Sequence, residues 1–91
     1  MENNYTDILR ECIKIAKERQ LSYGKATESI KKSVDILKEL FNIILTPTEF
    51  CFVMVSLKLG RGNFKFKKDS LIDCINYLAI GIACQEKYDT K

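Results

Sequence analysis

The stretch from Thr46 to Arg61 constrains this chain most, because it predicts a helix that is apolar on nearly every face. Thr46 suits an N-cap, Pro47 suits the first helical position, and Glu49 stands three residues after the cap, as in a capping box. The residues that follow, Phe50 to Leu59, place apolar side chains all round the helix. Such a helix has to be enclosed by other elements or by a partner chain. We therefore expect the other helices to pack around it.

The whole chain, residues 1–91, predicts a single all-α domain, a compact antiparallel four-helix arrangement that is oligomeric. Apolar residues at helical spacing predict helices at about 6–20, 27–44, 47–59 and 69–86. Ser22 and Gly24 mark the first break, and Thr27 is expected to cap the second helix. A domain this small with one wholly apolar helix often completes its core by association, so we expect a homodimer or a larger homo-oligomer.

Two polar regions are interpreted as solvated surface. Arg19 and its charged neighbours fill the face of the first helix opposite its apolar stripe. The basic segment 62–68, GNFKFKK, is interpreted as a loop that Phe64 and Phe66 anchor to the core. The alternative for this loop is stacking on bases, with its lysines holding phosphates.

Composition excludes several classes of protein. The four cysteines lie inside apolar helical patterns and have no CxxC spacing, and the chain has no histidine, so neither a disulfide framework nor a zinc site is expected. The polar N-terminus does not resemble a signal peptide, and no apolar run is long enough to span a membrane. A net charge of +3 with interspersed signs makes nucleic acid an unexpected partner. We expect a cytoplasmic protein with reduced thiols.

Polar residues that do not belong to a plain core gather on the predicted fourth helix. Their spacing places all of them on one face of the helix: Asp69, Asp73, Asn76 and Tyr77. Asp73 interrupts an apolar run, and a buried carboxylate needs a partner. Lys58 and Arg61, at the end of the apolar helix, are the expected cations. Two interpretations stay open: an ion pair that fixes the packing, or a small polar pocket between the third and fourth helices.

A metal site is a weaker expectation. Asp69 and Asp73 could together hold one Mg²⁺ and leave positions open for phosphate oxygens. Helix-borne catalytic magnesium sites normally need several carboxylates from at least two helices, and the second helix offers only Asp35 and Glu39 at a suitable spacing. Nucleophilic constellations that use histidine are excluded, and Gly60-Arg61-Gly62 is too short for a phosphate-binding loop. No cofactor is therefore expected, apart from Mg²⁺ if the protein is a hydrolase.

The order of these motifs resembles a group of small helical proteins common in phages and prophages. The pattern runs from Arg19 and Ser22-Tyr23-Gly24 through Leu45-Thr46-Pro47 to the Lys58–Arg61 helix end and the Asp69–Tyr77 helix. It is similar to the nucleotide-modification-associated domain and, more distantly, to the MazG-like all-α nucleoside triphosphate pyrophosphatases. The resemblance covers about residues 5–85 and matches at six positions: Tyr23, Lys58, Arg61, Asp69, Asp73 and Tyr77.

The resemblance implies a nucleotide-related role in a phage or mobile element. MazG-like hydrolases bind magnesium through an E-x-x-E helix and an E-x-x-D helix, and this chain has no E-x-x-E in its second helix. We therefore favour binding over hydrolysis, with sequestration of a nucleotide-derived immune signal of an anti-phage defence system as one form of it. In this hypothesis Lys58 and Arg61 neutralise phosphates, Tyr23 or Phe64 stacks on a base, and Asp73, Asn76 and Tyr77 complete the site.

Two alternatives remain. One is a magnesium-dependent nucleotide pyrophosphohydrolase, or an accessory enzyme of nucleotide modification, with Asp69 and Asp73 as metal ligands. The other is a helical domain whose polar residues serve only packing.

Overall fold

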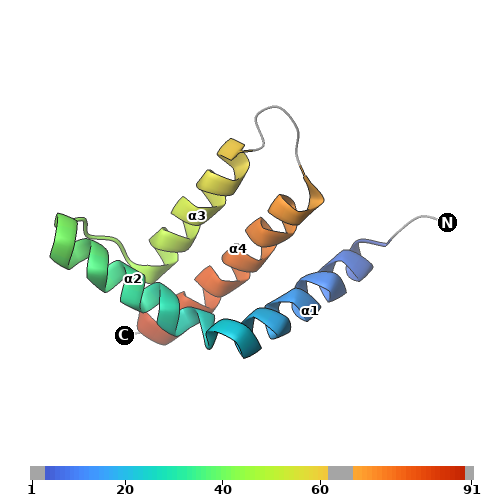
Figure 1. Ribbon diagram of the computed structural model, residues 1–91, viewed down its shortest axis with the longest axis horizontal. Coiled ribbons are helices and arrows are strands. Elements are labelled where there is room, and N and C mark those ends of the chain that lie inside the picture. Colours follow the sequence, from blue (N-terminus) through green and yellow to red (C-terminus); the bar gives the residue numbers. More distant parts are fainter. Residues whose placement is uncertain (1–3, 62–66, 90–91) are drawn as a thin grey trace.

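The computed structural model describes residues 4–61 and 67–89, and this part of the chain forms four α-helices and no strand (Figure 1). The helices are α1 (Tyr5–Tyr23), α2 (Ala26–Phe41), α3 (Pro47–Arg61) and α4 (Lys68–Tyr88). The prediction of an all-helical, four-helix chain is confirmed. Phe64 and Phe66, which carried the predictions for the basic loop, lie outside the described residues.

The predicted start of α3 is confirmed in atomic detail. The backbone N–H of Glu49 donates to the hydroxyl of Thr46 at 3.1 Å, and the backbone N–H of Thr46 donates to the carboxylate of Glu49 at 2.8 Å. These two hydrogen bonds are the reciprocal pair of a capping box. Thr46, Pro47 and Glu49 are therefore sufficient to predict where this helix begins.

The boundaries between α1, α2 and α3 differ from the prediction. α1 continues past Ser22 and ends before Gly24, whose φ of 81° is a conformation that suits glycine. Lys25, not Thr27, is the N-cap of α2, and its side chain makes no capping hydrogen bond. α2 ends at Phe41 because Asn42 adopts a left-handed conformation, with φ of 55°. A single αL residue stops the helix three residues before the predicted end.

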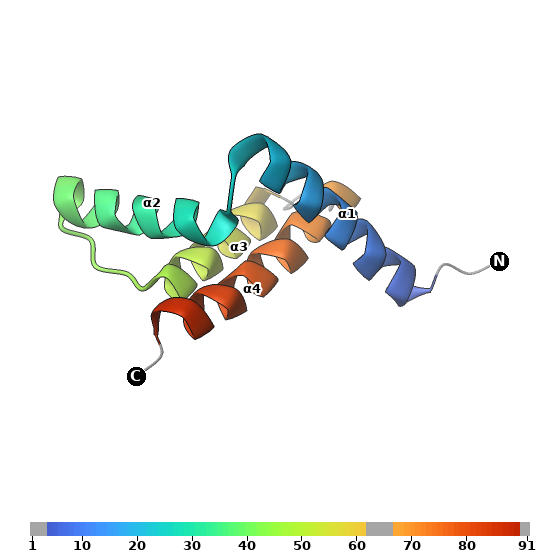
Figure 2. The ribbon, with the colours of Figure 1, turned by 90° about the horizontal axis from the view of Figure 1, so that it is seen from below.

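α4 contacts all three of the other helices, and α2 packs on α3 as well. α3 lies along α4, and both α1 and α2 also contact α4 (Figure 1). The expectation that the other helices enclose α3 is wrong for this chain, since Phe52 and Val53 remain about half exposed. α3 has more apolar surface than its two neighbours α2 and α4 can cover. Seen from below, α1 and α2 diverge from the turn that joins them (Figure 2).

The core is small and rich in cysteine. Within the described ranges, the buried hydrophobic core consists of Cys12, Ile30, Val34, Cys51, Ile72, Cys74 and Cys84. All four cysteines are free, which confirms their interpretation as small core residues. Burial, together with the neighbouring Cys84, raises the pKa of Cys51 to about 12, so its thiol stays neutral at ordinary pH. A Cβ added to Gly81 would lie 3.4 Å from the Cβ of Cys51, which shows how closely α3 approaches α4.

No helix in the described part of the chain combines the length and the hydropathy needed to cross a bilayer.

The core position of Ile72 gives the first prediction. Ile72 is 2% exposed, so Ile72→Ala leaves a cavity and should lower the free energy of unfolding by about 2–5 kcal/mol. Chemical denaturation measures this loss. Leu21→Ala is the matched control, because Leu21 is 90% exposed and its truncation should change stability little. Equal losses in the two variants would contradict the packing described here.

Candidate functional site

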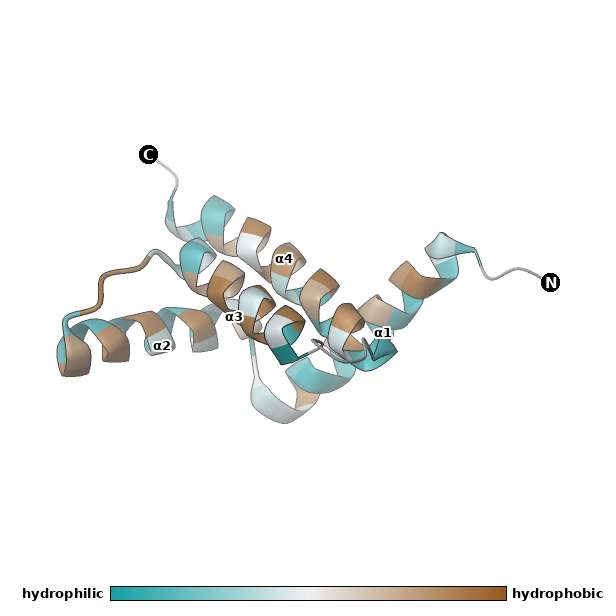
Figure 3. Cartoon of the chain, turned by 90° about the horizontal axis from the view of Figure 1, so that it is seen from above, coloured by the Kyte–Doolittle hydropathy of each residue, from teal (hydrophilic) through white to brown (hydrophobic). Residues whose placement is uncertain are grey.

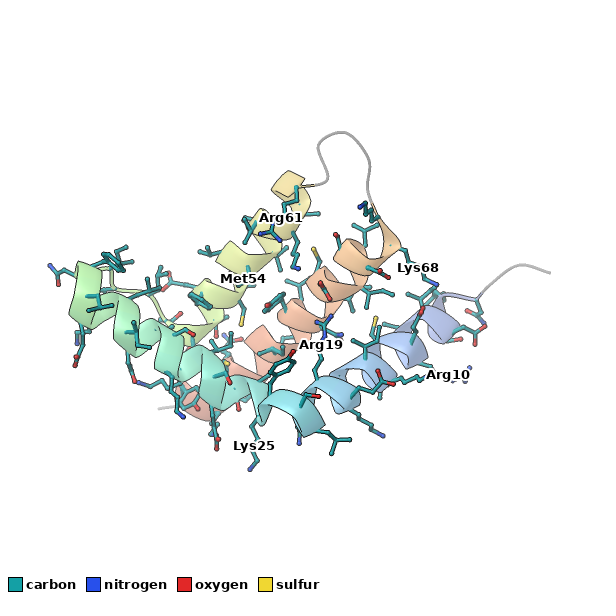
Figure 4. All side chains as sticks on the ribbon, in the orientation of Figure 1. Arg10, Arg19, Lys25, Met54, Arg61 and Lys68 are labelled. Carbon is teal, nitrogen blue, oxygen red and sulfur yellow. The ribbon has the colours of Figure 1, made fainter. Side chains whose placement is uncertain are left out.

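Asp73 joins three helices through two ion pairs. Its Oδ1 lies 2.9 Å from Nη1 of Arg19 on α1, and its Oδ2 lies 2.9 Å from Nζ of Lys58 on α3. The Asp73 side chain is 13% exposed, whereas that of Arg19 is 53% exposed. The predicted pairing with Lys58 is confirmed. Arg19 takes the place predicted for Arg61, and Figure 4 shows Arg19 pointing from α1 toward α4.

The pKa of Asp73 reflects these partners. Burial on its own raises the pKa of the carboxyl, but the hydrogen bonds and positive charges of Lys58 and Arg19 outweigh it. The pKa therefore lies below its ordinary value of 3.8. Asp73 is ionised throughout the physiological range, and one carboxylate faces two cations with a net positive charge left over.

A pocket of about 570 Å³ lies beside this cluster, between α1, α2 and α4. Its size is within the range of small-molecule sites. Apolar residues such as Ile30, Ile80 and Ala83 form part of its wall. Polar and aromatic side chains also line it, from the end of α1 and from α4: Arg19, Gln20, Tyr23, Asp73, Asn76 and Tyr77.

The prediction placed a pocket between the third and fourth helices, whereas the pocket beside Asp73 lies between α1, α2 and α4. At the predicted position Lys58 on α3 and Asp73 on α4 pair directly at 2.9 Å. The space lies instead where α1 and α2 diverge over α4. The turn at Gly24 and Lys25 directs the two helices apart, so it creates the pocket.

The first turn of α2 forms one edge of the pocket. Lys25, Ala26 and Thr27 line the pocket, and no side chain caps this helix terminus. The first backbone N–H groups of a helix have no intrahelical partner and lie at the positive end of the helix dipole. The side chain of Lys25 itself points outward from the turn, away from α4 (Figure 4), so the backbone N–H groups are the donors at this edge. This edge therefore favours an anion.

Asn76 carries a polar group without a partner. Its side chain lines the pocket, and its Nδ2 is buried and forms no hydrogen bond with the described residues. Buried amide groups are nearly always hydrogen-bonded, so an unpaired one beside a pocket is suited to a ligand acceptor.

The structure brings four of the six predicted ligand-binding residues to the pocket: Tyr23, Asp73, Asn76 and Tyr77. Lys58 is connected to it only through Asp73. Arg61 lies at the end of α3 and Asp69 is exposed in the first turn of α4, and neither lines the pocket. Among the described residues, no group of three or more His, Cys, Asp or Glu side chains could hold a metal ion.

Arg19 is the residue that sequence reasoning misplaced. Its charged neighbours indicate a solvated face, and the predicted first helix ends at Gln20, one residue after Arg19. α1 in fact extends to Tyr23, so Arg19 sits within the helix and reaches Asp73 on α4. The only sequence signal for such a cation is Asp73 itself, because a carboxylate within an apolar run requires positively charged partners.

Comparison with known proteins identifies a family but no activity. Residues 7–85 match the family described as Domain of unknown function (DUF6378), and the chain belongs to this family. No curated protein and no solved structure matches the chain.

The ion pairs of Asp73 predict a pH-dependent loss of stability. Asp73→Asn should lower the free energy of unfolding by about 1–2 kcal/mol near neutral pH, because Arg19 is half exposed and can rehydrate. Because the folded pKa is depressed, this contribution is present above the ordinary value of 3.8 and is lost as the pH falls through the lower folded pKa.

Urea denaturation of both proteins at a series of pH values measures the effect. The control is Asp35→Asn, which removes an exposed ion pair with Lys31 (2.6 Å) and should cost little. A difference between wild type and Asp73→Asn that is unchanged at the lowest pH would contradict the ion-pair account.

Proposed function

We propose that this protein binds a nucleotide or a nucleotide-derived small molecule in the pocket between α1, α2 and α4. The observation that carries the proposal is Arg19. Its guanidinium lies at the pocket with one nitrogen bonded to Asp73, while more than half of its side chain is exposed. A guanidinium has five N–H donors in a fork that matches phosphate oxygens.

The phosphate end of the ligand fits the side of the pocket formed by Arg19 and the first turn of α2. Arg19 supplies a fixed positive charge, and the backbone N–H groups that follow Lys25 supply further donors. Asp73 holds Arg19 in place, and Lys58 offsets the charge of Asp73. In this arrangement Lys58 is a positioning residue, and the predicted direct role of Arg61 in phosphate binding stays a prediction.

The base end of the ligand fits the apolar wall of α4. Tyr23 is 80% exposed at the end of α1, so its ring is available for stacking. Asn76 offers an unpaired amide donor to a base or ribose oxygen, and Tyr77 lies one residue further along the same wall. A nucleotide has this combination, because it joins negatively charged phosphate groups to a planar base.

Binding without cleavage has more support than magnesium-dependent hydrolysis. Both carboxylate oxygens of Asp73 are engaged by cations, and Asp69 does not line the pocket. Hydrolysis would require Asp73 to release these partners for a metal. The phage-type role proposed from the sequence resemblance, sequestration of a nucleotide-derived immune signal, is a specific form of the binding function.

We also propose that the protein acts as a homo-oligomer. The single chain exposes 7249 Å², whereas a folded monomer of its mass exposes about 5,400 Å². The surplus surface supports association with at least one further copy, which would cover the apolar surface that the single chain leaves exposed.

Isothermal titration with a panel of nucleoside mono-, di- and triphosphates and cyclic dinucleotides tests the function. Arg19→Gln should weaken the binding of the responding nucleotide by about tenfold or more, because a charge-assisted hydrogen bond to phosphate is lost. Arg10→Gln is the matched control, since Arg10 lies on the same helix and pairs with Asp7 at 2.9 Å, away from the pocket.

Titrations in EDTA and in Mg²⁺, with product analysis, separate the two functions. Binding that persists in EDTA without turnover is the expected result. A panel in which nothing binds, or binding that Arg19→Gln leaves unchanged, would contradict the proposed site. Turnover that requires Mg²⁺ would instead support the hydrolase.

A further inference from the structure

The far end of α2 carries a cluster of large apolar side chains that the chain itself does not cover. We call this surface the α2 arm. It consists of Ile36 (54% exposed), Leu40 (69%), Phe41 (65%), Ile43 (45%) and Ile44 (75%). Figure 3 shows the hydrophobic colour continuing along this end of α2 and into the segment that follows it. Exposed clusters of this kind in soluble domains mark interaction sites.

The α2 arm continues a stripe that is buried at the other end of the same helix. Ile30 and Val34 are each 8% exposed, and Ile30 belongs to the core cluster with Cys51 and Cys84. Leu37 and Phe41 follow at helical spacing on the same face, yet Phe41 is mostly exposed. The helix extends beyond the ends of its neighbours, as Figure 1 shows, so α3 and α4 cover only the first half of the stripe.

The surplus surface of the whole chain is of the size that a dimer interface buries. The excess over a folded monomer is about 1,800 Å² per chain. Obligate homodimers bury between about 1,000 and 2,500 Å² on each partner. The radius of gyration, 14.4 Å, likewise exceeds the value of about 12 Å expected for a compact domain of this length. One more copy of the chain is the occupant that this surplus fits.

The charges of α2 are compatible with self-association. The helix carries three lysines and three acidic residues, so two copies of α2 can meet without net repulsion. A two-fold interface also covers both arms at once, because each copy offers the surface that the other requires.

We propose that the α2 arm is the dimer interface of this protein, and that a second copy of the chain docks on it. α2 then has two functional ends, since its first turn forms an edge of the nucleotide pocket and its last turns form the interface. The pocket stays open in this dimer, because none of the five arm residues lines it.

Sedimentation velocity of the ligand-free protein over about a hundredfold range of concentration tests the proposal. We expect a dimer for the wild type. Leu40→Asp and Ile44→Asp should each raise the dimer dissociation constant at least about a hundredfold, because each substitution places a charge in the interface twice. Both residues are mostly exposed within one chain, so the variants should keep their helical circular dichroism.

Leu21→Asp is the matched control, since Leu21 is 90% exposed on α1 and does not belong to the arm. It should leave the dimer intact. A wild type that is monomeric at every concentration would overturn the proposal, as would a dimer that Leu40→Asp and Ile44→Asp leave unchanged. Because no nucleotide is present, this result is independent of the binding function.

Discussion

The charge of Asp73 is the constraint on which the arrangement of α1, α3 and α4 depends. A carboxylate with 13% exposure has to find cations, and it finds one on each of two other helices. Asp73 holds both Arg19 and Lys58 by these ion pairs, and the pair with Arg19 fixes the end of α1 over α4. Since only two residues separate the end of α1 from the start of α2, the same ion pairs also influence where α2 starts. The pocket exists because these two helices then diverge.

The same cluster links packing to the proposed function. Arg19 uses one nitrogen on Asp73 and keeps more than half of its side chain exposed at the pocket. A structural ion pair therefore also holds the group proposed to bind phosphate in position. The packing and binding interpretations, which the sequence left as alternatives, are compatible in this geometry. The packing depends on the nitrogen of Arg19 that pairs with Asp73, whereas the proposed binding also depends on its free donors.

The existence of the four helices and the start of α3 could be predicted from sequence, because they depend on neighbouring residues. The capping box at Thr46 and Glu49 is an example, and so is the helical face shared by Asp73, Asn76 and Tyr77. The position of the pocket could not be predicted, because it depends on how two helices diverge at Gly24. The partner of Asp73 was found only in part, since a cation on a distant helix leaves no local pattern.

The most direct test of the central claim is a two-dimensional ¹⁵N NMR titration of the protein with the nucleotide that binds best. The account predicts that the backbone signals of residues 24–28 and the side-chain amide of Asn76 move together and saturate with one ligand per chain. Arg19→Gln should abolish these movements at the same ligand concentration. Movements confined to the end of α3 around Arg61, or none at all, would contradict a nucleotide site between α1, α2 and α4.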